Sequence, residues 1–208
     1  MIREGYQKRN GVVLYFGEPL AHACPETFQS IPCHFKIRDY YGRDHAHVFY
    51  RDAMVKGADP ATFEIVSQWY ARDCQSGFFA GKAVPNSHGP CFQSVTDYYA
   101  RDHKRVFYHG RWMKTADPMH FQAIGMNYFT DRRHVYYDGK AIKDADAASF
   151  MLIGGDHLAT DKFGGYWRGR RCPAGTLLDH EEVQFFFIRN KHLTDYWFFK
   201  GRVDRNIF

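Results

Sequence analysis

One short string of residues returns along this chain at a fixed interval. Residues 44–50 (DHAHVFY) recur as residues 102–108 (DHKRVFY), 58 positions later, and again as residues 131–137 (DRRHVYY), a further 29 positions on. Each copy is followed by a lysine, an Ala-Asp pair and a phenylalanine. The period is therefore 29, and a diverged copy fills the gap at Asp73. A fixed period of 20 to 50 residues indicates a repeat architecture, and it constrains the fold more than any local propensity does.

Weaker copies continue the pattern towards both ends. Val13 and Tyr15 match Val48 and Tyr50 at a shift of 35, and residues 196–201 (YWFFKG) resemble the opening strand of one more copy. Atypical terminal copies are typical of a capped array. We therefore predict a single repeat domain over residues 1–208, with approximate units 9–43, 44–72, 73–101, 102–130, 131–160 and 161–194 and a truncated unit 195–208.

Each unit has the features of a β-hairpin followed by a helical turn. Residues 106–108 (VFY) predict a short strand, Gly110 supplies turn chemistry, and residues 112–114 predict the second strand. Asp117-Pro118 and Asp59-Pro60 are typical of a helix N-cap with proline at the first helical position. A phenylalanine then anchors the turn and leads into a further strand that reaches Tyr128 or its equivalents.

Aromatic residues make up 18% of the chain, and aromatic side chains favour pleated, half-buried surfaces. A unit of this size cannot bury its own apolar face, so neighbouring units must stack. We predict a mainly β tandem-repeat array of about six roughly 29-residue units. An open, solenoid-like arrangement is favoured over a closed, propeller-like one, because propeller blades usually need about 40 residues or more.

The repeated strings resemble those of the DKNYY family of bacterial tandem-repeat proteins. The matching strings are residues 102–108 and 131–137, each followed by Lys, Ala-Asp and Phe, although the Lys-Asn positions of the family name read His-Ala, His-Lys and Arg-Arg here. The resemblance covers residues 40–170 best. It implies the repeat architecture and supplies no catalytic residues.

Composition and charge bear on the location of the protein in the cell and on the kind of partner that it suits. The N-terminus lacks the apolar run of a secretory signal, and no stretch approaches a membrane span, so we expect a cytoplasmic protein, or a periplasmic one if an export signal has been removed. The formal net charge of +5 suits an acidic partner but is too dispersed to favour nucleic acid. The chain has five cysteines, and none of them forms a C-x-x-C pair with another. They are Cys24, Cys33, Cys74, Cys91 and Cys172.

Histidine is abundant, and four histidines directly follow an aspartate. Neighbouring residues on a strand point to opposite faces, so these pairs are interpreted as turn residues and not as catalytic dyads. His45 and His47 share a strand face, but no third ligand accompanies them at a suitable spacing. We expect no metal, no cofactor and no catalytic residues. The four pairs are Asp44-His45, Asp102-His103, Asp156-His157 and Asp179-His180.

Two alternatives remain open. Scattered His, Asp and Cys residues would form a hydrolase or metal enzyme if three or more of them met in a pocket, although Cys74 and Cys91 are first interpreted as small packing residues. Arginines between the tyrosines, such as Arg105 and Arg133, would suit single-stranded nucleic acid, but acidic neighbours such as Asp102 and Asp131 counteract them.

The period is disturbed over residues 164–175 (GGYWRGRRCPAG), where arginines surround a tryptophan. Trp, Tyr and Arg are common interface anchors, so we predict a partner-binding site, with an ordinary basic loop as the alternative. Its residues are Tyr166, Trp167, Arg168, Arg170 and Arg171. The expected function is a non-enzymatic protein-binding module, specifically an immunity protein that neutralises a cognate bacterial toxin with an acidic surface.

Overall fold

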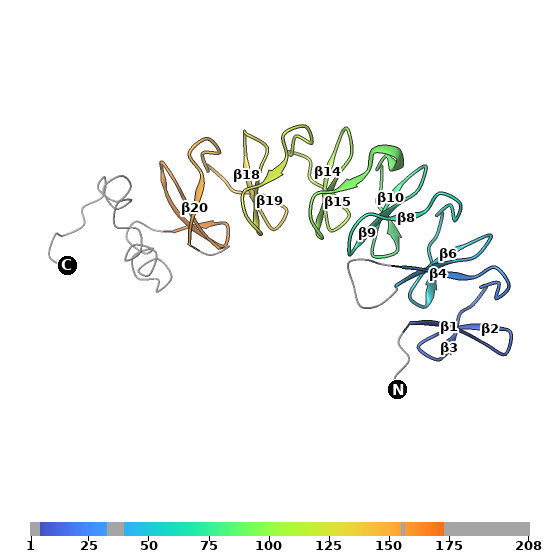
Figure 1. Cartoon of the computed structure of the whole chain (residues 1–208). Helices are drawn as coiled ribbons and strands as arrows, with labels where there is room; N and C mark the ends of the chain where they lie inside the picture. Colours follow the sequence, from blue (N-terminus) through green and yellow to red (C-terminus); the bar gives the residue numbers. More distant parts are fainter. Residues whose placement is uncertain (1–4, 33–39, 155–156, 173–208) are drawn as a thin grey trace. The chain divides into compact units, whose positions relative to one another are not determined.

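A computed structural model describes residues 5–32, 40–154 and 157–172 (Figure 1). Within these ranges the chain forms six small antiparallel sheets, one single-turn 3-10 helix and no α-helix, and none of the sheets closes into a barrel. The prediction of a mainly β tandem array is confirmed. The last predicted unit, 195–208, and unit 161–194 beyond residue 172 lie outside the described residues. No helix in the described part is long and apolar enough to cross a membrane.

The chain divides into two compact units, residues 1–114 and 115–208. The first unit contains four sheets and the 3-10 helix η1 (Gly89–Cys91). Sheet 1 is β1 (Tyr6–Arg9), β2 (Val12–Tyr15) and β3 (Glu18–Pro19); sheet 2 is β4 (Gln29–Ile31), β5 (Tyr41–Arg43), β6 (Val48–Tyr50) and β7 (Ala53–Met54); sheet 3 is β8 (Glu64–Ile65), β9 (Tyr70–Arg72), β10 (Gly77–Phe79) and β11 (Lys82–Ala83); sheet 4 is β12 (Gln93–Ser94), β13 (Tyr99–Arg101), β14 (Val106–Tyr108) and β15 (Arg111–Trp112).

The second unit contains two sheets of the same form. Sheet 5 is β16 (Gln122–Ala123), β17 (Tyr128–Thr130), β18 (Val135–Tyr137) and β19 (Lys140–Ala141); sheet 6 is β20 (Met151–Gly154), β21 (Leu158–Asp161), β22 (Gly164–Trp167) and β23 (Arg170–Arg171). In every sheet the strands pair in chain order as an antiparallel meander.

The sheets are out of phase with the sequence units. Strands β12 and β13 come from the predicted unit 73–101, whereas β14 and β15 come from unit 102–130, so one sequence unit supplies halves of two sheets. The single further strand expected before Tyr128 is two strands, because the N–H groups of Ile124 and Gly125 both bond to the Tyr128 carbonyl and turn the chain back. The hairpin's second strand also ends at Trp112, two residues earlier than expected.

The expected turn after each Asp-Pro pair is present. The Thr62 N–H bonds to the Asp59 carbonyl at 3.3 Å, and Asp59 Oδ1 accepts the Ala61 N–H at 3.0 Å, as an N-cap does. His120 and Asp117 repeat the first of these bonds at 3.3 Å. These turns are single, and only η1 is regular enough to be a 3-10 helix among the described residues.

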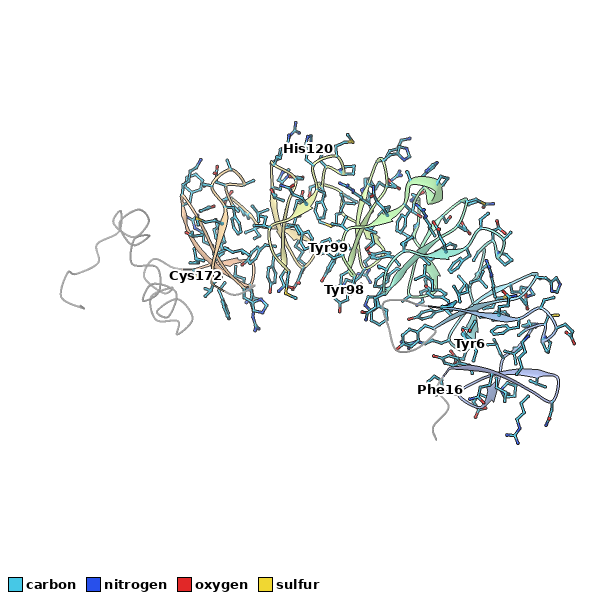
Figure 2. All side chains as sticks on the ribbon, in the orientation of Figure 1. Tyr6, Phe16, Tyr98, Tyr99, His120 and Cys172 are labelled. Carbon is cyan, nitrogen blue, oxygen red and sulfur yellow. The ribbon has the colours of Figure 1, made fainter. Side chains whose placement is uncertain are left out.

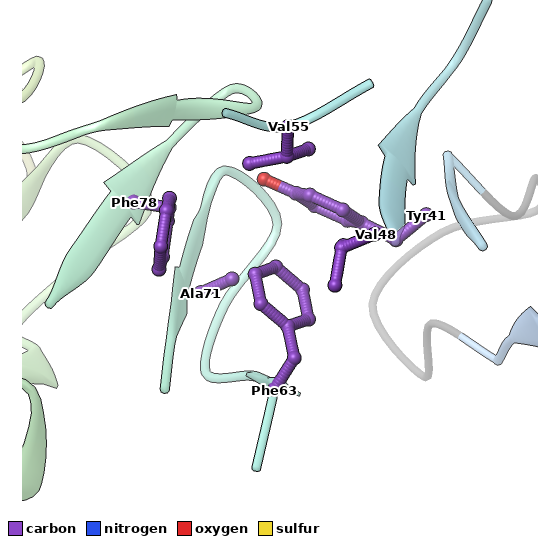
Figure 3. Close-up of a cluster of buried hydrophobic side chains, with 6 residues drawn as sticks. All are labelled: Tyr41, Val48, Val55, Phe63, Ala71 and Phe78. Atoms are coloured by element: carbon purple, nitrogen blue, oxygen red, sulfur yellow. The ribbon is translucent and has the colours of Figure 1, made fainter. Parts of the chain in front are cut away.

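The core lies between consecutive sheets within each unit. In one cluster, Tyr41, Val48 and Phe63 from sheet 2 and the turn after it pack on Ala71 and Phe78 of sheet 3 (Figure 3). Phe63 and Phe78 contact each other with ring centroids 5.3 Å apart. Because a sheet buries its apolar side chains only against its neighbour, the expected stacking of units is confirmed.

Candidate functional site

A buried aspartate organises the turn between the two central strands of a sheet. The Asp102 carboxylate accepts the N–H groups of Lys104 and Arg105 at 2.7 Å through Oδ1, and the N–H of His88 at 3.1 Å through Oδ2. It therefore ties its own turn to an earlier one. Five aspartates hold this place, and they are Asp44, Asp73, Asp102, Asp131 and Asp161. Their carboxylates are occupied by backbone groups, which supports a structural role for the turns that contain Asp44-His45 and Asp102-His103.

Hydrogen bonds lower the pKa of two of these aspartates, Asp131 and Asp44. Burial alone raises the pKa of Asp131, but bonds from the Tyr136 hydroxyl and from three backbone N–H groups outweigh it and lower the pKa to about 2. Burial alone would also raise the pKa of Asp44, but hydrogen bonds from backbone N–H groups outweigh it, and the pKa of Asp44 is lowered. These aspartates are therefore anionic at neutral pH and stabilise the turns through charge-assisted bonds.

Three side chains meet beside each buried aspartate. They are the turn's capping residue, the residue three positions later, and the residue directly after the aspartate. Beside Asp73 these are Asp59, Thr62 and Cys74, where Thr62 Oγ1 donates to Asp59 Oδ2 at 2.6 Å and accepts the Cys74 N–H at 3.0 Å. Beside Asp161 they are Asp146, Ser149 and Lys162, with Lys162 Nζ 2.7 Å from Asp146 Oδ2. Both sets are capping networks.

Beside Asp102 the same three places hold His88, Cys91 and His103. Cys91 Sγ lies 3.2 Å from His88 Nδ1 and 3.0 Å from His103 Nδ1, and one ligand atom from each of the three residues lies within 4.8 Å of the others. The sequence patterns indicated a turn residue at His103 and a packing residue at Cys91, so this cluster was not predicted. Aligning the turns by the period shows His and Cys at the places where two other turns carry Asp59 with Thr62 and Asp146 with Ser149.

The backbone under this cluster is fixed. The Gly89 N–H bonds to the Gln75 carbonyl at 3.0 Å, and a Cβ on Gly89 would lie 2.2 Å from the Asp73 carbonyl oxygen. Phe92, which follows η1, is fully buried. A cysteine within hydrogen-bond distance of histidines is suited to metal binding or to thiol chemistry.

His45 and His47, which the sequence places on one strand face, have different partners. His45 Nδ1 lies 3.0 Å from Thr27 Oγ1, whereas His47 Nδ1 lies 3.5 Å from Asp44 Oδ1. They do not converge on a common ligand position.

The opposite end of each sheet is a two-residue hairpin, which we call the hairpin tip. In four of the described sheets the last strand begins with a basic residue directly across from a half-buried aromatic one: Tyr108 pairs with Arg111, and Trp167 with Arg170. Phe79 with Lys82 and Tyr137 with Lys140 repeat the arrangement. Cross-strand partners share one face of the sheet, so four of the described sheets present a ring and a cation together.

Large apolar side chains are also exposed in the first unit. Tyr98, which is labelled in Figure 2, is half exposed. Its ring stacks on that of His109, with ring centroids 4.8 Å apart. Met54 and Trp112, at equivalent positions of sheets 2 and 4, are also about half exposed. A groove of about 590 Å³ lies between the tips of sheets 2 and 3, and its lining includes Tyr50 and Met54.

The predicted partner-binding residues lie in one regular hairpin and not in a disturbed loop. Arg168 is at the tip and its guanidinium carbon lies 5.2 Å from the Trp167 ring centroid, while Arg170 and Arg171 form the exposed strand β23. Tyr166 was wrongly included, because it is fully buried and its hydroxyl donates to Asp161 Oδ2 at 2.8 Å. Residues 173–175 of the predicted segment lie outside the described residues.

The comparisons with known proteins agree with the repeat. A family model described as the DKNYY family matches residues 1–82, 84–139 and 119–170. No curated protein and no solved structure matches the chain. Since the family model covers most of the sequence in overlapping segments, the chain belongs to the DKNYY family.

Proposed function

We propose that this protein is a non-enzymatic binding module whose hairpin tips bind an acidic surface of a partner protein. The observation that carries the proposal is the cross-strand pairing of a ring with a cation, as in Tyr108 with Arg111, at four of the described tips. A repeated array offers the same recognition element several times over, which suits an extended protein surface.

The aromatic side chains would supply most of the binding energy. Tyr and Trp are enriched among interface residues whose truncation costs most, since they bury large areas with little loss of conformational freedom. Tyr98 and Trp112 are each about half exposed, so a partner would bury additional apolar area on them. The stacking of Tyr98 on His109 holds that ring in place before binding.

The basic side chains would select the partner. Lys82, Arg111 and Arg170 are exposed, and each lies directly across from an aromatic residue of the neighbouring strand. Arginine pairs with carboxylates through two parallel hydrogen bonds, and a basic surface speeds association with an acidic one. The specific role we propose is neutralisation of a cognate bacterial toxin in the cytoplasm by covering an acidic surface of that toxin.

A binding role is favoured over the hydrolase alternative by the chemistry of the described turns. The carboxylate oxygens of the buried aspartates accept hydrogen bonds from backbone N–H groups, as at Asp102, so we expect no role as general bases for them. The groove between the tips of sheets 2 and 3 has a lining that includes neither Cys91 nor its two histidines.

The test is affinity capture from a lysate of the native host with the full chain as bait. We expect one acidic protein to be retained by the wild type and lost with the double variant Lys82→Glu, Arg111→Glu. The control variant, Lys104→Glu, Arg133→Glu, makes the same change of charge at exposed residues of the opposite turns and should retain the protein.

Two results would overturn the proposal. One is equal capture by both variants, because binding would then not use the hairpin tips. The other is retention of single-stranded nucleic acid instead of protein, with affinity falling steeply as salt rises, which would favour the nucleic-acid alternative.

A further inference from the structure

We propose that His88, Cys91 and His103 bind one zinc ion. The site lies at the turn end of sheet 4, away from the hairpin tip, because His103 lies two residues after Arg101, the last residue of β13, while Tyr98 directly precedes its first. The inference is therefore independent of the partner-binding proposal.

The distances fit a tetrahedral ion. Zinc is bound at about 2.3 Å by thiolate sulfur and about 2.0–2.1 Å by imidazole nitrogen, so tetrahedral angles place two such ligand atoms about 3.4–3.6 Å apart. Cys91 Sγ is 3.2 Å from His88 Nδ1 and 3.0 Å from His103 Nδ1. All three ligand atoms lie within 4.8 Å of one another, so the exposed His88 and His103 side chains would turn by about an ångström to bring their nitrogens to tetrahedral spacing around the ion.

The other repeats show what this position looks like without metal ligands. The equivalent places hold Asp59, Thr62 and Cys74 in one turn and Asp146, Ser149 and Lys162 in another, and both sets form capping hydrogen bonds. Beside Asp131 the capping residue is Asp117, which pairs with His120 at 2.8 Å. Among the described turns, three histidine or cysteine ligand atoms gather only beside Asp102.

The donor set favours zinc over the hard cations. Two imidazoles and one thiolate are borderline to soft ligands, whereas magnesium and calcium prefer oxygen. Three protein ligands leave the fourth tetrahedral position to a water molecule or to a side chain from outside. His88 and His103 are exposed, so an ion reaches the site directly from solvent.

The scaffold limits how far the ligands can move. The His88 N–H is held by Asp102, the Gly89 N–H by the Gln75 carbonyl, and the Phe92 N–H by the Gly89 carbonyl. The ion would thus join η1 to the turn between β13 and β14 and close a loop of chain, which stabilises the first unit against unfolding.

The experiment uses the full chain, stripped with a chelator and titrated with Zn²⁺ alone against a chromophoric zinc indicator. We expect one equivalent to bind with a dissociation constant below the micromolar range and to raise the melting temperature. Cobalt(II) should give a tetrahedral spectrum with a thiolate charge-transfer band.

The variants separate this cluster from the other thiols and histidines. Cys91→Thr restores the residue type that the Asp59 turn carries at this place, and His88→Asn keeps a side chain suited to the N-cap of η1 while removing the imidazole. Both variants should therefore fold, as circular dichroism would verify. Each change should weaken zinc binding by more than roughly 100-fold. Loss of a residue that only hydrogen-bonds to a ligand costs up to about 100-fold in metal affinity, and loss of a ligand itself should cost more. Cys74 and His45 stand in their own turns at the place that His103 occupies beside Asp102. The control variants Cys74→Ser and His45→Ala should bind zinc with the affinity of the wild type.

Absence of saturable zinc binding by the wild type would overturn the proposal. So would an unchanged affinity or an unchanged cobalt spectrum in Cys91→Thr, since the ion would then be held by other cysteines.

Discussion

The hydroxyl of Tyr70 accepts a hydrogen bond from the backbone N–H of Gly110 at 3.1 Å, although 40 residues separate them. The same hydroxyl donates to the Tyr98 carbonyl at 2.9 Å. One phenol therefore joins sheet 3 to the hairpin tip of sheet 4. Tyr41 with Gly81, and Tyr128 with Gly169, repeat the first bond at 3.0 and 2.9 Å. Burial raises the pKa of Tyr128 to about 12, even though the Gly169 N–H opposes the shift, so the hydroxyl keeps its proton and can donate.

Removing that hydroxyl should loosen the stack. In Tyr70→Phe the Gly110 N–H and the Tyr98 carbonyl lose their partner in a buried place, and we expect a loss of about 1–3 kcal/mol in the free energy of unfolding. Urea unfolding followed by circular dichroism measures it. Tyr98→Phe, at a half-exposed ring, should change stability by less than about 0.5 kcal/mol. Equal losses in the two variants would contradict a role of this hydroxyl between sheets.

The hairpin tips require glycine for two separable reasons. Gly81 has φ +76°, and a Cβ there would lie 2.5 Å from Tyr50 Cβ, so Gly81→Ala adds both backbone strain and a clash. Gly11 has φ +71° with nothing within 4 Å, so Gly11→Ala adds the strain alone. We expect about 1–2 kcal/mol of destabilisation for Gly11→Ala and clearly more for Gly81→Ala, measured by thermal unfolding. Equal effects would mean that sheet 3 does not approach Tyr50 so closely.

Acid should unfold the second unit through Asp131. Its pKa of about 2 lies below the roughly 3.9 of an unfolded aspartate, so its contribution is complete above about pH 4 and is lost as pH falls towards 2. The shift corresponds to about 2 kcal/mol. Unfolding free energies from pH 6 to pH 2 test this, with Asp131→Asn as the comparison. The variant should be less stable at neutral pH and should show a smaller fall in acid.

The period and the apolar alternation made much of the fold predictable. In the strand Val106–Tyr108, Phe107 is buried and Tyr108 is only partly buried, as the alternation of faces predicts for this pair of rings. The period gives the spacing between repeats but not the residue at which each sheet begins, so the sheet boundaries could not be predicted from it. The alternation of Tyr136 and Tyr137, carried forward by the period, would have placed Tyr166 inside and Trp167 at the surface.

The cluster of His88, Cys91 and His103 was harder to predict for a different reason. Each residue has a reasonable structural role within its own unit, and only the carboxylate of Asp102, by binding the His88 N–H, brings the two turns together. The cluster therefore depends on a hydrogen bond between residues that are distant in the sequence. Comparison of equivalent turns was the signal available in the sequence, because Asp and Thr at the Asp59 turn become His and Cys here.

The three arginines of sheet 6 give the last prediction. Arg168, Arg170 and Arg171 are exposed around Trp167, and Arg171 Nη2 donates an exposed hydrogen bond to the Phe163 carbonyl at 2.6 Å. We expect the triple change to Ser to leave the melting temperature nearly unchanged, because exposed charges and exposed hydrogen bonds contribute little to stability. Affinity for the acidic partner should fall, by about 2 kcal/mol if one arginine is desolvated on binding. If all three lie at the rim, the association rate should fall instead and should depend on salt. Titration calorimetry and stopped-flow mixing at low salt distinguish the two, and equal affinity and rate in wild type and variant would exclude this hairpin from the interface.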